Sequence, residues 1–372
     1  MTQQIHELED SLASCNRCGL CHGCSPLLEV QRLESSTARG KIRLARSFIR
    51  GELEASDTLV DRIYECLMCG HCSSTCPAGI RVEEIIQKTR TILVSARKTP
   101  HTLRSIASKI NLSGNIYGKE IEGPNLPDSE LVYFPGCVSS IKHPELANAT
   151  ISCLSSAGLG VTVLKGICCG APAWAAGFTE VYDKISEKLQ AMLEDKNVVT
   201  GCPQCYYFLK KIRHIQVQHV TQTYTEILDK RKLRPLKPIK GTYTYFDPCY
   251  LARFSNIVDE PRAVMSQLRK FKLVEMESNR KNAKCCGNGL GLGQTSYPEL
   301  SSKVARNRVG EALDIKAETI VTSCPHCYLT LGKVGRERKT PVEIRDISQL
   351  LEEACMLPSS TRKQKAKTNF VG

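Results

Sequence analysis

Two stretches of the chain share one pattern: NVVTGCPQCYYFL at residues 197–209 and TIVTSCPHCYLTL at residues 319–331. Each starts with a short run rich in β-branched residues and continues into the motif C-P-x-C. Such a run predicts a buried strand that ends just before the cysteines. Because the same pattern occurs twice over this length, the sequence indicates an internal repeat.

The repeat extends well beyond these two stretches. LVYFPGCV at residues 131–138 corresponds to TYTYFDPCYL at 242–251, GICCGAP at 166–172 to AKCCGNG at 283–289, and HVTQTYTEIL at 219–228 to DISQLLEEA at 346–354. Further strands are expected at VTVL, IQVQHV and VEI, with helical patterns such as ELANATISCLSSAG and SKVARNRVGEALDI between strands. Alternating strands and helices predict a small parallel sheet in each copy. Ligands gather at the carboxyl ends of such strands, where these cysteines lie.

The composition narrows the protein class. The chain has 372 residues, of which 20 are cysteines, and a formal net charge of +13. So many cysteines suit either a secreted disulfide scaffold or an intracellular metal protein. The start MTQQIHELEDSLAS lacks the apolar core of a signal peptide, and no apolar run is long enough to span a membrane. We therefore expect a cytoplasmic protein whose clustered cysteines hold metal. Nucleic-acid binding is disfavoured because aromatic residues are few and Lys and Arg look scattered.

Two runs of four cysteines lie near the N-terminus, CNRCGLCHGCSP at residues 15–26 and CLMCGHCSSTCP at 66–77. The second is a strict C-x2-C-x2-C-x3-C-P, the bacterial ferredoxin spacing for [4Fe–4S] clusters, whereas zinc more often uses two separated C-x2-C pairs. In this arrangement the fourth cysteine of each run binds the other cluster. The predicted sets are Cys15, Cys18, Cys21 and Cys76 for the first cluster and Cys66, Cys69, Cys72 and Cys24 for the second. The last gap of the first run is one residue shorter than the pattern, so Cys24 departs from it.

Each copy of the repeat carries five more cysteines. They are Cys137, Cys168, Cys169, Cys202 and Cys205 in the first copy, and Cys249, Cys285, Cys286, Cys324 and Cys327 in the second. A cubane cluster needs one protein sulfur for each of its four irons, so five exceed its demand. Adjacent cysteines can hardly form a disulfide, because the small ring would distort the peptide bond between them. Such a pair can instead direct two sulfurs at neighbouring irons of a more open cluster.

These motifs resemble the catalytic iron–sulfur subunit of heterodisulfide reductases, in which a ferredoxin domain precedes two CCG domains. The resemblance is carried by GCV…CCGAP…GCPQC, by DPCYLAR…CCGNG…SCPHC and by STARGKIRLARSFIRGE, and it spans roughly residues 10 to 355. It implies that each set of five cysteines holds a noncubane [4Fe–4S] cluster. It also implies that these clusters face each other, receive electrons from the two cubane clusters, and reduce a disulfide such as coenzyme M joined to coenzyme B.

The expected fold class is therefore α+β, with an N-terminal helical bis-[4Fe–4S] ferredoxin domain followed by two repeated α/β CCG domains. The expected division is a ferredoxin domain at residues 1–100, a linker at 101–129, the first CCG domain at 130–232, a basic linker at 233–241, the second CCG domain at 242–357 and a disordered tail at 358–372.

The resemblance leaves alternatives open. Similar iron–sulfur subunits relay electrons for flavin-dependent glycolate, lactate or acyl-CoA oxidoreductases, and these often lack CCG cysteines that are complete here. A branch from sulfate reducers acts on a protein-borne sulfur substrate. Because the chain has no flavin or nicotinamide fingerprint, an electron-donating partner is implied. This partner is either a membrane cytochrome b or a soluble flavoprotein. A membrane cytochrome b would hold the chain at the inner face of the membrane. The implied disulfide is anionic, and Arg253 is a candidate for binding it.

Residues near these motifs have smaller expected roles. His71 and His326 lie inside cysteine loops and are expected to tune clusters through hydrogen bonds rather than to bind iron. Cys153 and Cys355 are expected to be ordinary buried thiols. The stretch GNGLGLG at residues 287–293 follows a cysteine pair rather than a clean strand, which disfavours a dinucleotide-binding loop.

Overall fold

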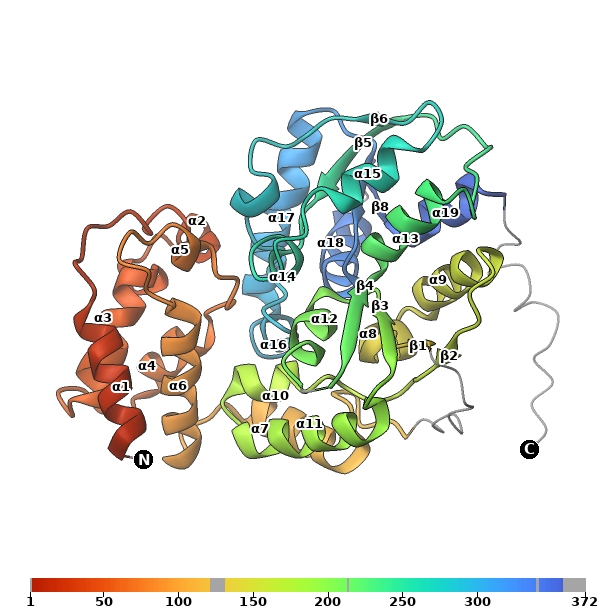
Figure 1. Cartoon of the computed structure of the whole chain (residues 1–372). Helices are drawn as coiled ribbons and strands as arrows, with labels where there is room; N and C mark the ends of the chain where they lie inside the picture. The colour runs from red at the N-terminus through yellow and green to blue at the C-terminus, as the bar shows by residue number, and fades with distance from the viewer. Residues whose placement is uncertain (1, 121–130, 213, 339–340, 357–372) are drawn as a thin grey trace.

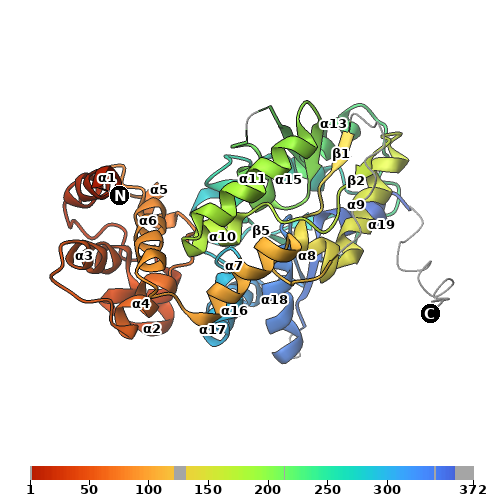
Figure 2. The same cartoon turned by 90° about the horizontal axis from the view of Figure 1, so that it is seen from below.

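The computed structural model describes residues 2–120, 131–212, 214–338 and 341–356. Helices from the first hundred residues gather at one end of the molecule, and the two sheets with their helices occupy the rest (Figures 1 and 2). The expected α+β class is confirmed by two small parallel sheets that follow a wholly helical N-terminal part.

The N-terminal part consists of short helices joined by the cysteine loops. They are α1 (Thr2–Ala13), α2 (Pro26–Gln31), the 3-10 turn η1 (Glu34–Ser36), α3 (Ala38–Ile49), α4 (Asp57–Tyr64), α5 (His71–Ser74) and α6 (Val82–Ser95). Thr37 and Ser56 cap α3 and α4, because their side chains accept hydrogen bonds from backbone N–H groups of the first turn. The amphipathic helices α3, α4 and α6 bury their apolar faces against one another.

Both copies of the repeat build the same four-stranded parallel sheet. The strand orders are β2-β1-β3-β4 and β6-β5-β7-β8. The strands are β1 (Leu131–Tyr133), β2 (Thr162–Val163), β3 (Asn197–Thr200), β4 (Gln216–His219), β5 (Thr242–Phe246), β6 (Lys272–Leu273), β7 (Thr319–Thr322) and β8 (Glu343–Asp346). Seven of these were expected from the sequence, and β6, only two residues long, was not.

The helices of the two copies also correspond. The first copy has α8 (Gly136–Ile141), α9 (Pro144–Ser156), α10 (Ala171–Ala176), α11 (Thr179–Leu193), α12 (Pro203–Leu209) and α13 (Val220–Asp229). The second has α14 (Cys249–Ala252), α15 (Glu260–Ser266), the turn η2 (Arg280–Asn282), α16 (Leu292–Ser296), α17 (Pro298–Asp314), α18 (Pro325–Arg338) and α19 (Ile347–Ala354). Even a capping box recurs, with His219 and Gln222 on α13 and with Asp346 and Gln349 on α19.

The two copies pack against each other reciprocally. Helix α9 of the first copy lies on α19 of the second, and α15 of the second lies on α13 of the first. In the same way α12 contacts α14, and α18 contacts α8. Because equivalent surfaces exchange equivalent contacts, the copies are related by an approximate two-fold axis, as in an isologous dimer.

The segment expected as a linker is more ordered than its composition suggested. Residues 101–113 form a helix, α7 (His101–Ser113), which buries Leu103, Ile106 and Ile110 against α10, α11 and α16. The basic segment 233–241 contains no helix or strand, although Leu233 and Ile239 are buried in the core of the repeats. The expected tail at 358–372 and residues 121–130 of the expected linker lie outside the described residues.

Among residues 2–120, 131–212, 214–338 and 341–356, no helix combines the length and the apolar character that a transmembrane span requires.

Candidate iron–sulfur sites

The inner cavity of the N-terminal part is surrounded by the cysteines predicted for the second cluster. Cys24, Cys66, Cys69 and Cys72 all line this space. Cys24 is buried and reaches the cavity despite the shortened gap that precedes it. The backbone amide of His71 hydrogen-bonds to the Cys69 thiol, so His71 acts here through its main chain. Its buried ring has a pKa lowered to about 4 by desolvation, followed by the repulsion of Arg253, and is therefore neutral.

The outer cavity holds the other predicted set. It is lined by Cys15, Cys18, Cys21 and Cys76. Cys72 lies in the walls of both cavities, so the two are neighbours. Cys18 is exposed to solvent, whereas Cys24 and Cys69 of the inner set are buried. The outer site is therefore the one that another molecule could approach.

Two buried cations lie beside the inner cavity. Lys41 donates to the carbonyl of Arg62, and burial lowers its pKa to about 8. Among the described residues, no carboxylate pairs with Arg90, which donates instead to the carbonyls of Ile63, Tyr64, Cys66 and Ala175, at 2.8–2.9 Å. Ala175 belongs to α10 of the first copy, so Arg90 joins the loop of Cys66 to the repeat. The sequence offered no signal for this role, since Arg90 looks like any polar residue of an amphipathic helix.

A close backbone contact accompanies Arg90. Gly177 follows α10 with φ of +90°, and a Cβ there would lie 2.5 Å from the main-chain carbon of Arg90. Only glycine permits both this left-handed conformation and this approach. The junction between the N-terminal part and the first copy is thus fixed by main-chain packing as well as by hydrogen bonds.

The five cysteines of each copy gather at the carboxyl ends of the strands, as expected from the sequence. In the first copy the thiols contact one another in the order Cys137, Cys168, Cys169, Cys205, Cys202. In the second the order is Cys249, Cys285, Cys286, Cys327, Cys324, with 3.4 Å between the sulfurs of Cys286 and Cys327. Corresponding cysteines of the two copies therefore follow one another in the same order. Each copy therefore presents five converging sulfur donors, a set that fits an iron–sulfur cluster and exceeds what a single metal ion needs.

The thiols within each set do not behave alike. A hydrogen bond from Cys205 holds the pKa of Cys202 well below the usual thiol value, and one from Cys285 does the same for Cys286. Burial and neighbouring thiols raise the pKa of other members, Cys327 among them. In each copy this hydrogen bond favours the thiolate of one cysteine, the form in which cysteine binds metal.

His326 lies between the two sets. It belongs to the C-P-H-C motif of the second copy, yet its side chain hydrogen-bonds to Cys202 of the first. Burial lowers the pKa of His326, but this bond and the nearby thiols Cys169 and Cys286 outweigh it and raise the pKa. The sequence placed His326 at its own cysteine loop, whereas the structure shows that it reaches across the two-fold axis. Gln204 occupies the corresponding position in the first copy and is also buried.

The inner cavity and the second cysteine set are in direct contact. The thiols of Cys69 and Cys285 hydrogen-bond to each other. Gly70, with φ of +71°, packs against Phe254, and a Cβ there would lie 2.5 Å from that ring. The cysteine groups thus form a series: outer cavity, inner cavity, second set and first set.

Arg253 has a structural role that the sequence did not predict. Its Nε donates to the carbonyl of Cys69 at 2.8 Å, and its Nη1 donates to the carbonyls of Lys281 and Ala283. With these bonds the guanidinium joins the inner cluster loop to the turn that precedes Cys285. Arg253 therefore has a structural role between the two sites, and its binding of an anionic substrate stays a prediction, since its buried Nη2 has no partner among the described residues.

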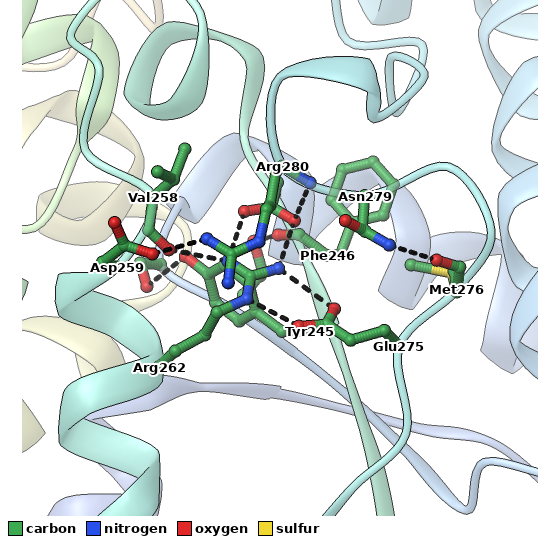
Figure 3. Close-up of polar contacts among 12 residues, drawn as sticks. Tyr245, Phe246, Val258, Asp259, Arg262, Glu275, Met276, Asn279 and Arg280 are labelled. Atoms are coloured by element: carbon green, nitrogen blue, oxygen red, sulfur yellow. Dashed lines mark hydrogen bonds and ion pairs between the residues drawn. The ribbon is translucent and has the colours of Figure 1, made fainter.

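A second arginine, Arg262, fixes the strand end that leads to Cys249. Its guanidinium lies between Glu275 and the ring of Tyr245 (Figure 3) and makes two bonds of 2.9 Å to the carboxylate of Asp247. The same carboxylate accepts the backbone N–H of Arg280 at 2.7 Å. Asp247 thus connects the residues before Cys249 with the turn before Cys285. Neither contact could be read from the sequence, where these residues are far apart.

The remaining residues singled out from the sequence lie outside the sites or support them. Cys153 is buried on α9, with its thiol 3.7 Å from the carbonyl of Ser348, and Cys355 is half-buried after α19. The glycine-rich stretch after Cys286 forms a tight turn in which Asn288 accepts the N–H of Gly291 at 2.6 Å. Tyr117, which the sequence gave no reason to single out, is partly buried and packs beside Cys137 and Cys168 of the first set.

Comparison with known proteins agrees with this organisation. A family model described as a 4Fe-4S dicluster domain matches residues 11–80, and one described as a cysteine-rich domain matches residues 131–210 and 243–332. The chain is 29% identical to one component of the dihydromethanophenazine:CoB–CoM heterodisulfide reductase of Methanosarcina barkeri, over 96% of both proteins. It is 27% identical to one component of the fumarate reductase (CoM/CoB) of Methanothermobacter marburgensis, over 92% of this chain and 72% of that protein.

More distant relatives widen the group. EtfAB:quinone oxidoreductase of Syntrophomonas wolfei is 23% identical over 79% of this chain, which covers 46% of that protein. A crystal structure of a hypothetical protein from Helicobacter pylori has the same fold, with a TM-score of 0.60 at 11% identity over 88% of this chain and 69% of that one. From the dicluster domain, the two cysteine-rich domains and full-length similarity, we conclude that the chain belongs to the iron–sulfur oxidoreductase family that includes the matching component of heterodisulfide reductase.

Proposed function

We propose that the chain reduces an anionic disulfide, such as the coenzyme M–coenzyme B heterodisulfide, to two thiols as the catalytic subunit of a complex. The observation that carries this proposal is the pair of complete five-cysteine sets that meet at His326. A relay that only passes electrons onward has no need of two such sets facing each other. The relatives whose names contain CoB–CoM heterodisulfide reductase support the same substrate class.

Cofactor binding follows from the same geometry. We assign cubane [4Fe–4S] clusters to the outer and inner cavities, with the cysteine sets that line them, and a noncubane [4Fe–4S] cluster to each set of five. Splitting a disulfide takes two electrons while a bound iron–sulfur cluster supplies one at a time, so two facing clusters would match the demand.

The chain's own residues then have defined tasks. Cys69 and Arg253 keep the inner site against the second set, and His326 keeps the second set against the first. Tyr117 shields the first set from water, and the ammonium of Lys142 lies 5.1 Å from the centre of its ring. Because Lys142 is exposed and positively charged, it suits an anionic group of the disulfide better than Arg253 does.

The partner of this chain is an electron donor, a membrane cytochrome b or a soluble flavoprotein, and a cytoplasmic location stays a prediction. The runner-up function is electron transfer alone, within a flavin-dependent hydroxy-acid or acyl-CoA oxidoreductase complex. The similarity to an EtfAB:quinone oxidoreductase favours this second candidate.

Anaerobic turnover assays separate the two functions. Cluster-loaded protein receives reduced methyl viologen and the heterodisulfide, and viologen oxidation is followed. We expect turnover in the native chain. Cys168→Ser and Cys285→Ser should each lower the turnover rate by more than about 100-fold, as is usual for residues that act as a unit. Cys355→Ser should leave the rate unchanged, because this half-buried cysteine lies outside the sites. Survival of activity in either site variant would show that the site is misassigned. Native protein that oxidises viologen only with a quinone acceptor would favour electron transfer alone.

A further inference from the structure

Four arginines of α3 and its C-terminal cap form one continuous stripe. Arg39, Arg43, Arg46 and Arg50 are spaced i, i+4, i+7 and i+11 and fall within an arc of about 60° at 100° per residue. The buried residues Lys41 and Ala45 lie on the other side of α3, more than about 120° from the middle of the stripe. From the sequence alone Lys and Arg looked scattered, but on this helix they are gathered.

The stripe is largely unpaired. Arg39 hydrogen-bonds to Glu34 at 2.7 Å, whereas no ion pair with Arg43, Arg46 or Arg50 is found in the part of the chain that the structure describes. Arg43 and Arg50 are exposed and Arg46 is half-exposed. Like charges one turn apart repel by a few tenths of a kcal/mol per pair. The fold itself therefore gains little from this arrangement.

The stripe begins at the outer cysteine cavity. Arg39 lines that cavity together with Arg17, and Cys18 there is exposed. Leu20, between Cys18 and Cys21, is 61% exposed. Figure 2 shows α3 at the end of the molecule farthest from the sheets, so the surrounding repeats do not cover this face. Positive charge and the exposed apolar side chain of Leu20 thus lie beside the most accessible of the four candidate cluster sites.

We propose that this face, made of Arg39, Arg43, Arg46, Arg50 and Leu20, docks an electron-donating protein whose own surface is acidic around its redox centre. Complementary charge steers two proteins into productive encounters and raises the association rate, while a small apolar contact excludes water at the centre. The inference rests on the proposed function and adds to it the chemistry of the donor. An anionic membrane is the weaker match, because the apolar face of α3 is turned into the core and cannot enter a bilayer.

The test measures reduction of the cluster-loaded full chain by a reduced plant-type [2Fe–2S] ferredoxin, an acidic carrier, in anaerobic stopped flow over a range of salt concentrations. The variant is Arg43→Gln/Arg46→Gln/Arg50→Gln. Its control, Arg231→Gln/Lys232→Gln/Arg234→Gln, removes the same charge from exposed residues where the first copy ends and the basic segment begins. Dithionite reduction, which needs no docking, checks that the clusters are intact, and vesicles containing phosphatidylglycerol probe membrane binding.

We expect the native second-order rate constant to fall steeply with salt, and the α3 variant to lose about tenfold or more of it at low salt. The control variant should keep the native rate to within about twofold, and dithionite should reduce all three proteins equally. An α3 variant with native rates, a control that falls equally, or a native rate that ignores salt would overturn the proposal. So would loss of vesicle binding without loss of ferredoxin-driven reduction. No disulfide enters this assay, so its failure leaves the proposed disulfide chemistry standing, and the reverse also holds.

Discussion

The carboxylate of Asp247 is expected to hold the turn before Cys285 in place, and Asp247→Asn tests this directly. The side chain is 1% exposed and accepts three hydrogen bonds, from Nη1 and Nη2 of Arg262 and from the backbone N–H of Arg280. Asparagine keeps the volume and one acceptor oxygen. Its amide nitrogen, however, would face a donor from Arg262 or Arg280, so at least one donor in this buried place loses its partner.

The size of the effect follows from these contacts. Hydrogen bonds to charged groups contribute roughly 1.5–3 kcal/mol each, and breaking a buried ion pair costs about 3–5 kcal/mol. Arg262 keeps Glu275 as a partner, at 2.6 Å, so we expect a value near the lower end, about 3 kcal/mol for local opening. Since 1.4 kcal/mol is tenfold in an equilibrium constant, protection of the Arg280 amide should fall by roughly 100-fold.

Hydrogen exchange with mass spectrometry on the cluster-loaded chain reads this amide through peptides that cover residues 276–286. Glu275→Gln is the matched control, because Glu275 binds the same guanidinium but is 32% exposed, and water can replace much of its contribution. We expect less than about tenfold loss of protection there. An Arg280 amide as protected in Asp247→Asn as in the native chain would refute the reasoning.

Two further predictions concern buried charges. Arg90→Met leaves the carbonyls of Ile63, Tyr64, Cys66 and Ala175 without their donor. Because each unsatisfied buried carbonyl costs about 1–3 kcal/mol, the thermal unfolding midpoint should fall by several degrees. An unchanged midpoint would contradict this expectation. Burial raises the pKa of Asp346 to about 6, so its contribution to stability is full below the unfolded pKa of 3.8 and is lost as pH rises through 6. Asp346→Asn keeps the helix cap and removes this loss. It should therefore raise the free energy of unfolding by on the order of 2 kcal/mol at pH 7.5 and by clearly less at pH 5. A gain in the free energy of unfolding that does not depend on pH would argue against this.

Much of the fold could be predicted because its signals are local. Runs such as NVVT and TIVT are too apolar and β-branched for anything but buried strands, and both became central strands of their sheets. Strand β6 was missed because two residues carry no periodicity. Helix α7 was not predicted, because residues 101–129 were treated as one linker on account of the Gly- and Pro-rich stretch that follows the helix. Leu103, Ile106 and Ile110 nevertheless have helical spacing.

The candidate sites also combine features that local sequence predicts with features that only the fold reveals. Three cysteines of each cavity come from one run, where short spacings fix how neighbouring thiols lie, and the exchange of Cys24 and Cys76 followed from the known ferredoxin pattern. The contacts of Arg253 with Cys69 and of His326 with Cys202 join residues more than a hundred positions apart, so no local pattern contains them. The α3 stripe is an intermediate case, because its spacing was visible in the sequence but its exposure was not.

The central claim is that two facing noncubane clusters act on a disulfide, and anaerobic EPR of the oxidised, cluster-loaded chain tests it most directly. Spectra are recorded with and without the coenzyme thiols, alongside iron analysis of the same samples. The account predicts about sixteen irons per chain, four for each of four clusters, and a paramagnetic signal that appears only when a coenzyme thiol is added. A chain that saturates near eight irons and shows no thiol-dependent signal would contradict it.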